Sequence, residues 1–250
     1  MTTSPFKTSV TRQDLLIGTL QTLPSPEITE VLCSAGFDWL FVDLEHGAMG
    51  IGDAQTILQA AAPQMPCLLR VPVNDETWIK KALDIGAAGI IVPQVRTAEE
   101  AQQAVRCCRY PPEGLRSVGI ARAHGYGDRF QDYMASANDA IVVVIQIEHV
   151  DALAHLPAIL DVTGVDAIFV GPYDLAASMG RMGRPDDADV VAAIGRITTG
   201  AGKKDVPLGI FGATADAVKP YIDQGYSLIA VGMDTLLLSR AARDIHAGLK

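Results

Sequence analysis

Two carboxylates, Glu148 and Asp174, each follow a short apolar run of the sequence, at 141–147 and 166–170. If these runs are neighbouring parallel strands, their carboxyl ends meet and both side chains face one space. Two carboxylates supply hard oxygen ligands and leave positions for water or substrate, which suits Mg²⁺ or Mn²⁺, with Co²⁺ as an alternative. The competing interpretation is that each carboxylate only caps the helix that follows it.

Arg70 ends a third apolar run, at 66–69. An arginine in such a place needs an anion or a carbonyl dipole, because an unpaired buried guanidinium is costly. Alternatively, it forms a salt bridge to Asp43 or Glu148 that only stabilises the protein.

Asp43 and His46 lie three residues apart where a fourth run, 38–44, turns into a loop. A carboxylate that accepts from one imidazole nitrogen raises the basicity of the other, so the pair could act as a general base. Taken alone, the D-x-x-H spacing is common on protein surfaces. His124, in the glycine-rich segment 120–127, is a further candidate for the mouth of a site.

Short apolar runs alternate with segments of helical period along the whole chain. The runs that predict strands are 15–20, 38–44, 66–71, 89–93, 141–147, 166–170, 207–211 and 228–231. The segments that predict helices are 26–35, 53–62, 75–85, 97–108, 150–162, 187–200, 213–224 and 233–249. The strands are almost entirely apolar, as parallel strands covered on both faces are. Asn74, Thr97 and Thr214 have the chemistry of helix caps, and Gly36, Gly86 and Gly225 follow helix ends.

This alternation predicts a single-domain (β/α)₈ TIM barrel over residues 1–250, with its core at 10–248. The alternative is an open doubly wound sheet, but no G-x-G-x-x-G follows the first strand. One stretch, 110–139, is rich in proline and glycine and predicts a long functional loop followed by a short helix.

Composition excludes some classes of function. The net charge of −9 disfavours nucleic acid as a partner, and no apolar stretch is long enough to cross a membrane. Residues 1–10 are polar and lack the apolar segment of a secretory signal. None of the four cysteines has metal-type C-x-x-C spacing, which suits free thiols in the reducing cytoplasm.

Several motifs together resemble the HpcH/HpaI family of metal-dependent pyruvate aldolases, which act on 4-hydroxy-2-oxoheptanedioate or 2-keto-3-deoxy-sugar acids. They are F-D-W-L-F-V-D-L-E-H-G at 37–47, L-R-V-P at 69–72, G-I-I-V-P at 89–93, Q-I-E at 146–148 and G-P-Y-D-L-A-A-S-M-G at 171–180. The last motif is the most specific. The similarity extends over residues 15–244 and reaches, more distantly, the β chains of citrate lyase.

The resemblance implies a role for each motif. Glu148 and Asp174 match the metal ligands, Arg70 the residue that holds the keto oxygen of pyruvate, and His46 with Asp43 the base. Gln146 matches a side chain that contacts pyruvate, and the backbone at Tyr173 and Asp174 matches the part that binds the carboxylate of pyruvate. Asp84 matches a residue that reaches the site of the adjacent subunit. The family assembles as hexamers, trimers of dimers in which the last helix packs on a neighbouring subunit.

Four positions depart from the pattern. Tyr173 stands where alanine is frequent, Leu20 where some members have tryptophan, Phe211 where leucine is frequent, and His149 where threonine is common. Leu20, Tyr173 and Phe211 are expected to shape the substrate pocket. These departures concern the identity of the aldehyde rather than the reaction class.

The residues and the resemblance together predict a class II aldolase, a carbon–carbon lyase that forms or cleaves a 4-hydroxy-2-oxo acid through a metal-stabilised pyruvate enolate. No lysine follows a strand in a way that suggests a Schiff base. The alternatives are oxaloacetate decarboxylation, a citrate-lyase-like cleavage, and a barrel that binds a 2-oxo acid without catalysis.

Overall fold

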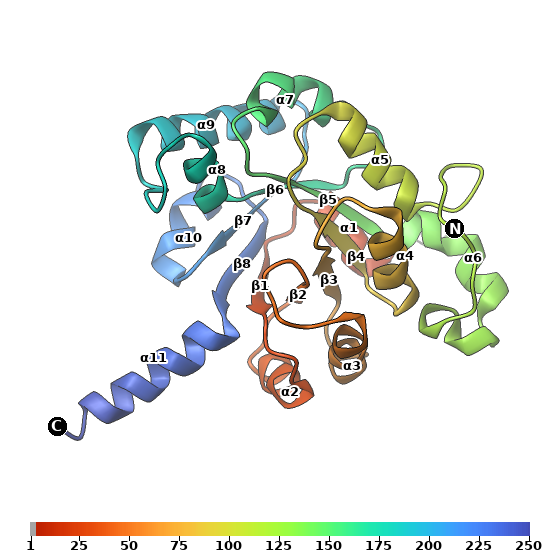
Figure 1. Ribbon diagram of the computed structural model, residues 1–250, viewed down its shortest axis with the longest axis horizontal. Helices are drawn as coiled ribbons and strands as arrows, with labels where there is room; N and C mark the ends of the chain where they lie inside the picture. Colours follow the sequence, from red (N-terminus) through yellow and green to blue (C-terminus); the bar gives the residue numbers. More distant parts are fainter. Residues whose placement is uncertain (1–3) are drawn as a thin grey trace.

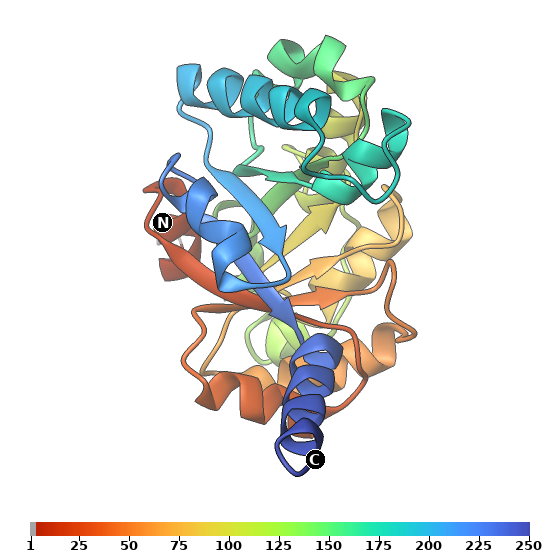
Figure 2. The ribbon, with the colours of Figure 1, turned by 90° about the vertical axis from the view of Figure 1, so that its left-hand side faces the viewer.

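The computed structural model describes residues 4–250 and forms a closed barrel of eight parallel strands that pair in chain order from β1 to β8 (Figures 1 and 2). The strands are β1 (Leu16–Gln21), β2 (Trp39–Asp43), β3 (Cys67–Arg70), β4 (Gly89–Val92), β5 (Val142–Ile147), β6 (Ala167–Val170), β7 (Leu208–Gly212) and β8 (Leu228–Met233). All eight predicted strands are present, and the (β/α)₈ barrel is confirmed.

Helices follow the strands and surround the barrel (Figure 1). They are α1 (Pro5–Thr11), α2 (Pro26–Ser34), α3 (Ile51–Ala61), α4 (Glu76–Asp84), α5 (Ala98–Cys108), the 3₁₀ helix η1 (Arg122–Gly127), α6 (Phe130–Ala140), α7 (Ala152–Leu160), α8 (Pro172–Ser178), α9 (Ala188–Lys203), α10 (Ala215–Ile222) and α11 (Asp234–Ala247). The sequence analysis missed α1 and α8. Each has seven residues, too few for a helical period to stand out, although each begins with a proline.

Local capping chemistry explains several helix boundaries. The Thr97 and Thr214 side chains accept from the amides of Glu100 and Ala217, as predicted. The predicted cap at Asn74 is wrong: the Asp75 carboxylate caps α4, because it accepts from the Thr77 amide at 2.8 Å.

Side chains of alternate strand residues fill the barrel interior. Trp39, Phe41 and Phe169 are fully buried there, with the Phe41 and Phe169 rings edge to face at 5.7 Å between centroids. Val10 and Phe6 of α1 pack against the same interior cluster. The Lys7 ammonium binds the Ile141 carbonyl at 2.8 Å and Asp166 at 3.0 Å, both immediately before a strand. Helix α1 therefore closes the N-terminal end of the barrel, opposite the end where the predicted site residues lie.

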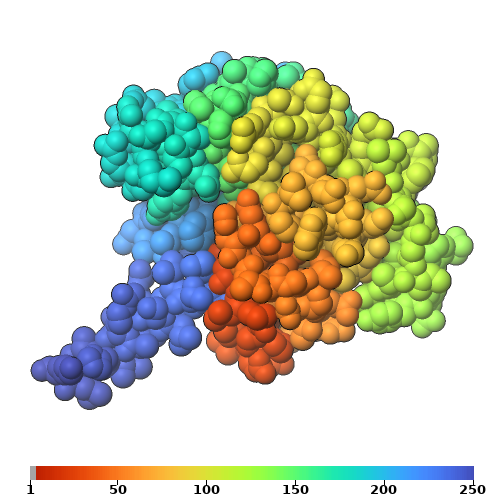
Figure 3. Space-filling view, in the orientation of Figure 1, coloured from red at the N-terminus to blue at the C-terminus, as the bar shows by residue number. Residues whose placement is uncertain are grey.

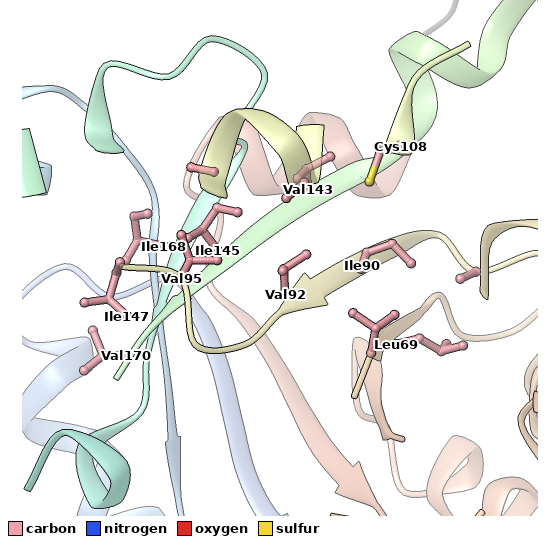
Figure 4. Packing of buried hydrophobic residues seen from close by; sticks show 14 of the residues in the cluster. Leu69, Ile90, Val92, Val95, Cys108, Val143, Ile145, Ile147, Ile168 and Val170 are labelled. Atoms are coloured by element: carbon pink, nitrogen blue, oxygen red, sulfur yellow. The ribbon is translucent and has the colours of Figure 1, made fainter. Parts of the chain in front are cut away.

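The other strand residues face outward and form a second apolar layer beneath the helices. Figure 4 shows part of this layer, in which Leu69, Ile90, Val92, Val143 and Ile145 come from three adjacent strands. With both faces of each strand buried, the uniformly apolar strand sequences are explained.

Helix α11 is an exception to this arrangement, because it leaves the barrel and projects from the molecule (Figures 1–3). Asp234 is its only buried residue. Its carboxylate accepts from the amides of Thr22 and Leu23 and from the Thr22 hydroxyl, which fastens the start of the helix to the segment after β1.

All four cysteines are free thiols, as predicted, and Cys67, Cys107 and Cys108 are buried. Among residues 4–250, no helix is long and apolar enough to span a membrane.

We expect Gly89→Ala to destabilise the barrel by about 1–3 kcal/mol, the usual cost of overpacking. A Cβ at this position would lie 2.3 Å from the Val142 carbonyl oxygen and 2.7 Å from the Leu68 side chain. Gly52→Ala is the control, since nothing lies within 4 Å of a Cβ there, and should change the free energy of unfolding by less than about 1 kcal/mol. Urea unfolding of the two variants measures both; equal values would contradict the packing argument.

Candidate active site

The polar residues of the site continue the inward-facing rows of the strands. In β2 the row is Trp39, Phe41 and Asp43, and in β3 it is Leu68 and Arg70. Strand residues two apart point to the same face, so the last member of each row points into the barrel mouth. The pairing of β2 with β3 sets Asp43 directly beside Arg70. An apolar strand that ends in an inward charge is thus a sequence signal for this site.

Arg70 is held by two carboxylates. Its Nε and Nη2 atoms donate to the two oxygens of Asp43 at 2.9 and 2.7 Å, and its Nη1 lies 3.2 Å from the Glu45 carboxylate. The guanidinium also lies 5.2 Å from the centre of the Phe41 ring. The salt bridge from Arg70 to Asp43, considered as an alternative role, is therefore present. Because the side chain also lines the cavity described below, its binding to Asp43 fixes its direction rather than removing it from the site.

The predicted pairing of Asp43 with the His46 ring is not formed. Asp43 is occupied by Arg70 and accepts from the backbone amides of Glu45 and His46 at 3.0 and 3.4 Å. The His46 side chain is 63% exposed, and its Nε2 atom lies 3.7 Å from the Glu45 carboxylate. Spacing alone could not distinguish these partners, because a ring three residues on in a turn can lie on either side of the carboxylate.

Glu45 is a functional candidate that the sequence analysis missed. Its side chain is only 15% exposed, and its Oε2 atom, close to both Arg70 and His46, makes no hydrogen bond within the described residues. Burial raises the pKa of Glu45 to about 7, against the attraction of Arg70. An acidic residue directly before His46 was the available signal.

Glu148 is buried, and both of its oxygens accept hydrogen bonds. Oε1 accepts from the Gln94 amide at 2.8 Å, and Oε2 accepts from the Gln146 side-chain amide. Gly171 makes this arrangement possible, since a Cβ there would lie 2.7 Å from Oε2 of Glu148. Burial raises the pKa of Glu148, and the negative charge of Asp174 raises it further. Asp174 follows Gly171 by three residues, so both carboxylates belong to the same end of the barrel.

This donor set fits a divalent cation. A cation between Glu148 and Asp174 would remove the repulsion between them, and carboxylate oxygens are the ligands that Mg²⁺ and Mn²⁺ prefer. Within residues 4–250, no three His, Cys, Asp or Glu side chains are grouped to hold a metal ion. A metal here would thus have two protein ligands and several positions left for water and substrate.

A cavity of about 470 Å³ lies at this end of the barrel. The predicted residues that line it are Leu20, Asp43, His46, Arg70, Gln146, Tyr173, Asp174 and Phe211. The sequence analysis missed Thr22, Phe41, Phe169, Met233 and Leu236, which also line it. Phe41 and Phe169 belong to the interior rows, and their apolar side chains gave no sign of a site.

Three other candidates do not line the cavity. Glu148 is buried next to it, hydrogen-bonded to the lining residue Gln146. Asp84, at the end of α4, binds the fully buried Arg116 at 2.7 Å. His124, a candidate for the mouth, does not line it: it is buried between the Phe130 and Tyr133 rings, with its Nε2 3.0 Å from the Tyr110 hydroxyl.

Comparison with known proteins agrees with this geometry. The family model described as HpcH/HpaI aldolase/citrate lyase matches residues 19–241. A 4-hydroxy-2-oxo-heptane-1,7-dioate aldolase of Escherichia coli is 42% identical over 246 residues, which cover 97% of this chain and 93% of that protein. The enzyme of the same name from Klebsiella pneumoniae is 44% identical over 92% of this chain and 88% of its own length. A family member of known structure from Burkholderia cenocepacia has a TM-score of 0.95 and 34% identity, with 99% of each chain covered.

The raised pKa of Glu45 predicts a pH-dependent contribution to stability. Since the folded chain holds this proton up to a pH of about 7 and the unfolded chain releases it near 4.5, the contribution of Glu45 to stability falls as the pH rises between these values. Glu45→Gln lacks this titration, so its free energy of unfolding should rise relative to the original protein across the same interval.

The measurement is urea unfolding of metal-free protein at several pH values. Glu30→Gln, the same change on an exposed residue of α2, controls for a general effect of charge. A difference between Glu45→Gln and the original protein that stays flat over this interval would mean that Glu45 titrates equally in the folded and unfolded chains.

Proposed function

Because the chain belongs to the HpcH/HpaI aldolase/citrate lyase family, we propose that it is a class II, divalent-metal-dependent aldolase that interconverts a 4-hydroxy-2-oxo acid with pyruvate and an aldehyde. The observation that carries the proposal is the cavity at the barrel mouth, where Arg70, Gln146 and Asp174 converge and Gln146 is hydrogen-bonded to the buried carboxylate of Glu148. A pyruvate enolate carries negative charge on its oxygen, and the oriented guanidinium of Arg70 together with a metal held by Glu148 and Asp174 would stabilise that charge.

Glu148 and Asp174 would hold the metal. When bound, Mg²⁺ or Mn²⁺ would supply Lewis-acid polarisation of the 2-oxo acid. The protein prepares this position through the Gln94 amide and the Gln146 side chain, which orient the Glu148 carboxylate before any ligand arrives.

Arg70 would donate a hydrogen bond to the keto oxygen of pyruvate, where negative charge accumulates as the carbon–carbon bond breaks. The two hydrogen bonds from Arg70 to Asp43 support this role, because they hold the guanidinium in one direction and limit its reorganisation during the reaction. A preorganised donor of this kind contributes roughly 10²–10³ in rate.

His46 would act as the general base on the 4-hydroxyl group, with Glu45 as its carboxylate partner in place of Asp43. The exposed ring can reach a substrate that fills the cavity, and Glu45 lies beside its Nε2 atom. In the cleavage direction the base takes the hydroxyl proton, the C3–C4 bond breaks, and the aldehyde leaves. The proton then returns to the methyl carbon of pyruvate.

Gln146 and the backbone at Tyr173 and Asp174 would contact pyruvate, and Leu20 and Phe211 would contact the aldehyde. All five residues line the same cavity, which supports this division. Gln146 lies on the floor, next to the proposed metal position, whereas Leu20 and Phe211 form part of its apolar wall.

We further propose that the chain assembles as a homohexamer, a trimer of dimers, in which α11 packs on a neighbouring subunit. The support is that α11 projects from its own barrel while Leu238, Ile245 and Leu249 are more than half exposed. Asp84 would then reach the neighbour's site, with Arg116 fixing its orientation. The free thiols support a reducing cytoplasm as the location.

Loss of either carboxylate should remove metal binding and enolate chemistry together. For Glu148→Gln and Asp174→Asn we expect Mn²⁺ affinity, measured by calorimetry, to fall more than about 100-fold, because removing an outer-shell partner already costs 10–100-fold. Exchange of the pyruvate methyl protons with deuterium, followed by NMR, should fall at least about 100-fold. Asp151→Asn, an exposed acid near the same rim, is the control. Full exchange in EDTA-treated protein would overturn the metal-dependent mechanism, and a barrel that only binds 2-oxo acids would show no exchange at all.

Charges on the apolar face of α11 should break the assembly. We expect Leu238→Lys combined with Ile245→Lys to reduce the mass measured by light scattering, because a charge in a packed apolar interface loses hydration without a partner. Arg240→Gln changes a charge on the same helix without removing apolar surface and should leave the mass unchanged. An unaltered mass in the double variant would mean that α11 does not mediate the contact.

A further inference from the structure

The cavity at the barrel mouth has two chemically distinct sides. The polar side carries Asp43, His46, Arg70, Gln146 and Asp174, and Gln146 is hydrogen-bonded to the buried Glu148. The residues from β1, β7, β8 and the start of α11 give the cavity an apolar side, formed by Leu20, Phe211, Met233 and Leu236. The buried rings of Phe41 and Phe169 lie next to the polar groups, Phe41 against Arg70 and Phe169 beside Gln146. A substrate whose 2-oxo acid end lies on the polar side must therefore extend its other end along the apolar side.

The apolar side offers no cation to a second acidic group. Arg70 is the only lysine or arginine that lines the cavity within residues 4–250. Its guanidinium already lies against the carboxylates of Asp43 and Glu45, and the proposed mechanism commits a remaining N–H to the keto oxygen of pyruvate. A carboxylate at the far end of the substrate would thus lose hydration without gaining a partner.

A groove of about 540 Å³ continues the cavity outward and has the same character. Tyr173 and Phe211 line both spaces, and Val191, Ile194 and Tyr221 extend the apolar surface. The charged residues that line the groove are two acids, Asp186 and Asp216. Lys219, the cation beside Asp216, is bound to it at 2.9 Å. An anionic tail would meet repulsion here as well.

We propose that the aldehyde half of the substrate is uncharged and apolar, an aliphatic or aromatic aldehyde, and not one that ends in a carboxylate. This inference rests on the proposed aldolase function and specifies its second substrate. It separates this chain from its E. coli and K. pneumoniae relatives, whose name describes a dioate substrate. Tyr173, at the junction of cavity and groove, is the residue that sets the preference, since the tail must pass it.

Butanal and succinic semialdehyde are a matched pair for the test, because both have four carbons and differ only in a terminal methyl or carboxylate. With the full-length protein, Mg²⁺ and pyruvate, we expect kcat/KM in the condensation direction to be at least about tenfold higher for butanal, the discrimination that a single group in an apolar pocket provides. Equal values, or a preference for the semialdehyde, would overturn the proposal.

Substitution of Tyr173 tests the assignment to this residue. Tyr173→Arg adds a cation at the junction and should shift the butanal-to-semialdehyde ratio at least about tenfold toward the semialdehyde, whereas Tyr173→Leu, which stays apolar, should keep the original preference. Equal ratios in the two variants would contradict the role of Tyr173.

Deuterium exchange at the pyruvate methyl, measured without aldehyde on the same preparations, tests the aldolase function separately from the aldehyde preference. Absence of exchange would defeat the proposed function and this inference with it. Exchange together with a preference for the semialdehyde would defeat this inference alone.

Discussion

The binding of Arg70 by Asp43 and Glu45 is the constraint on which the site depends. A guanidinium that is almost buried among aromatic and aliphatic side chains needs anionic partners, and two carboxylates from the preceding strand and loop provide them. The requirement has a consequence for each acid. Asp43 is committed to orienting the arginine, and Glu45 becomes the group next to the His46 imidazole. The division of labour among four charged residues thus follows from the cost of leaving one cation unpaired at the barrel mouth.

The barrel converts this local requirement into a site through the two-residue period of its strands. Large apolar side chains fill the interior from the closed N-terminal end upward. The inward rows of β2, β3 and β5 end in Asp43, Arg70 and Gln146, whereas those of β1, β7 and β8 end in the apolar residues Leu20, Phe211 and Met233. Helix α1 closes one end, so the other is the only end of the interior among the described residues that opens to substrate. Gly171 leaves room for the Glu148 carboxylate, because a Cβ at this position would lie 2.7 Å from Oε2 of Glu148.

The distribution of charge in the same cavity supports the proposed preference for an uncharged aldehyde. Its charges are concentrated on one side, where they are mutually satisfied or prepared for a cation, and its other side is hydrocarbon. The segment after β6 contributes to both spaces, because Asp174, on the polar side of the cavity, and Tyr173, at the junction with the groove, are adjacent on α8. In the proposed reaction, the metal ligand Asp174 and the residue that selects the aldehyde, Tyr173, are thus neighbours that act through separate interactions.

The sequence by itself determined the barrel and most members of the site. The local signals are eight apolar runs, helix caps such as Thr97 and inward charges such as Arg70. They could be predicted because strand period and helix capping depend on residues that are near in sequence. Only the tertiary structure decided which charges pair: Asp43 with Arg70 rather than with His46, and Glu45 beside the imidazole. It also decided that α11 leaves its own barrel, that His124 is buried, and that Phe41 and Phe169 line the cavity. Partner choice among side chains depends on strand register and on directions in space, and neither is contained in the spacing of residues along the chain.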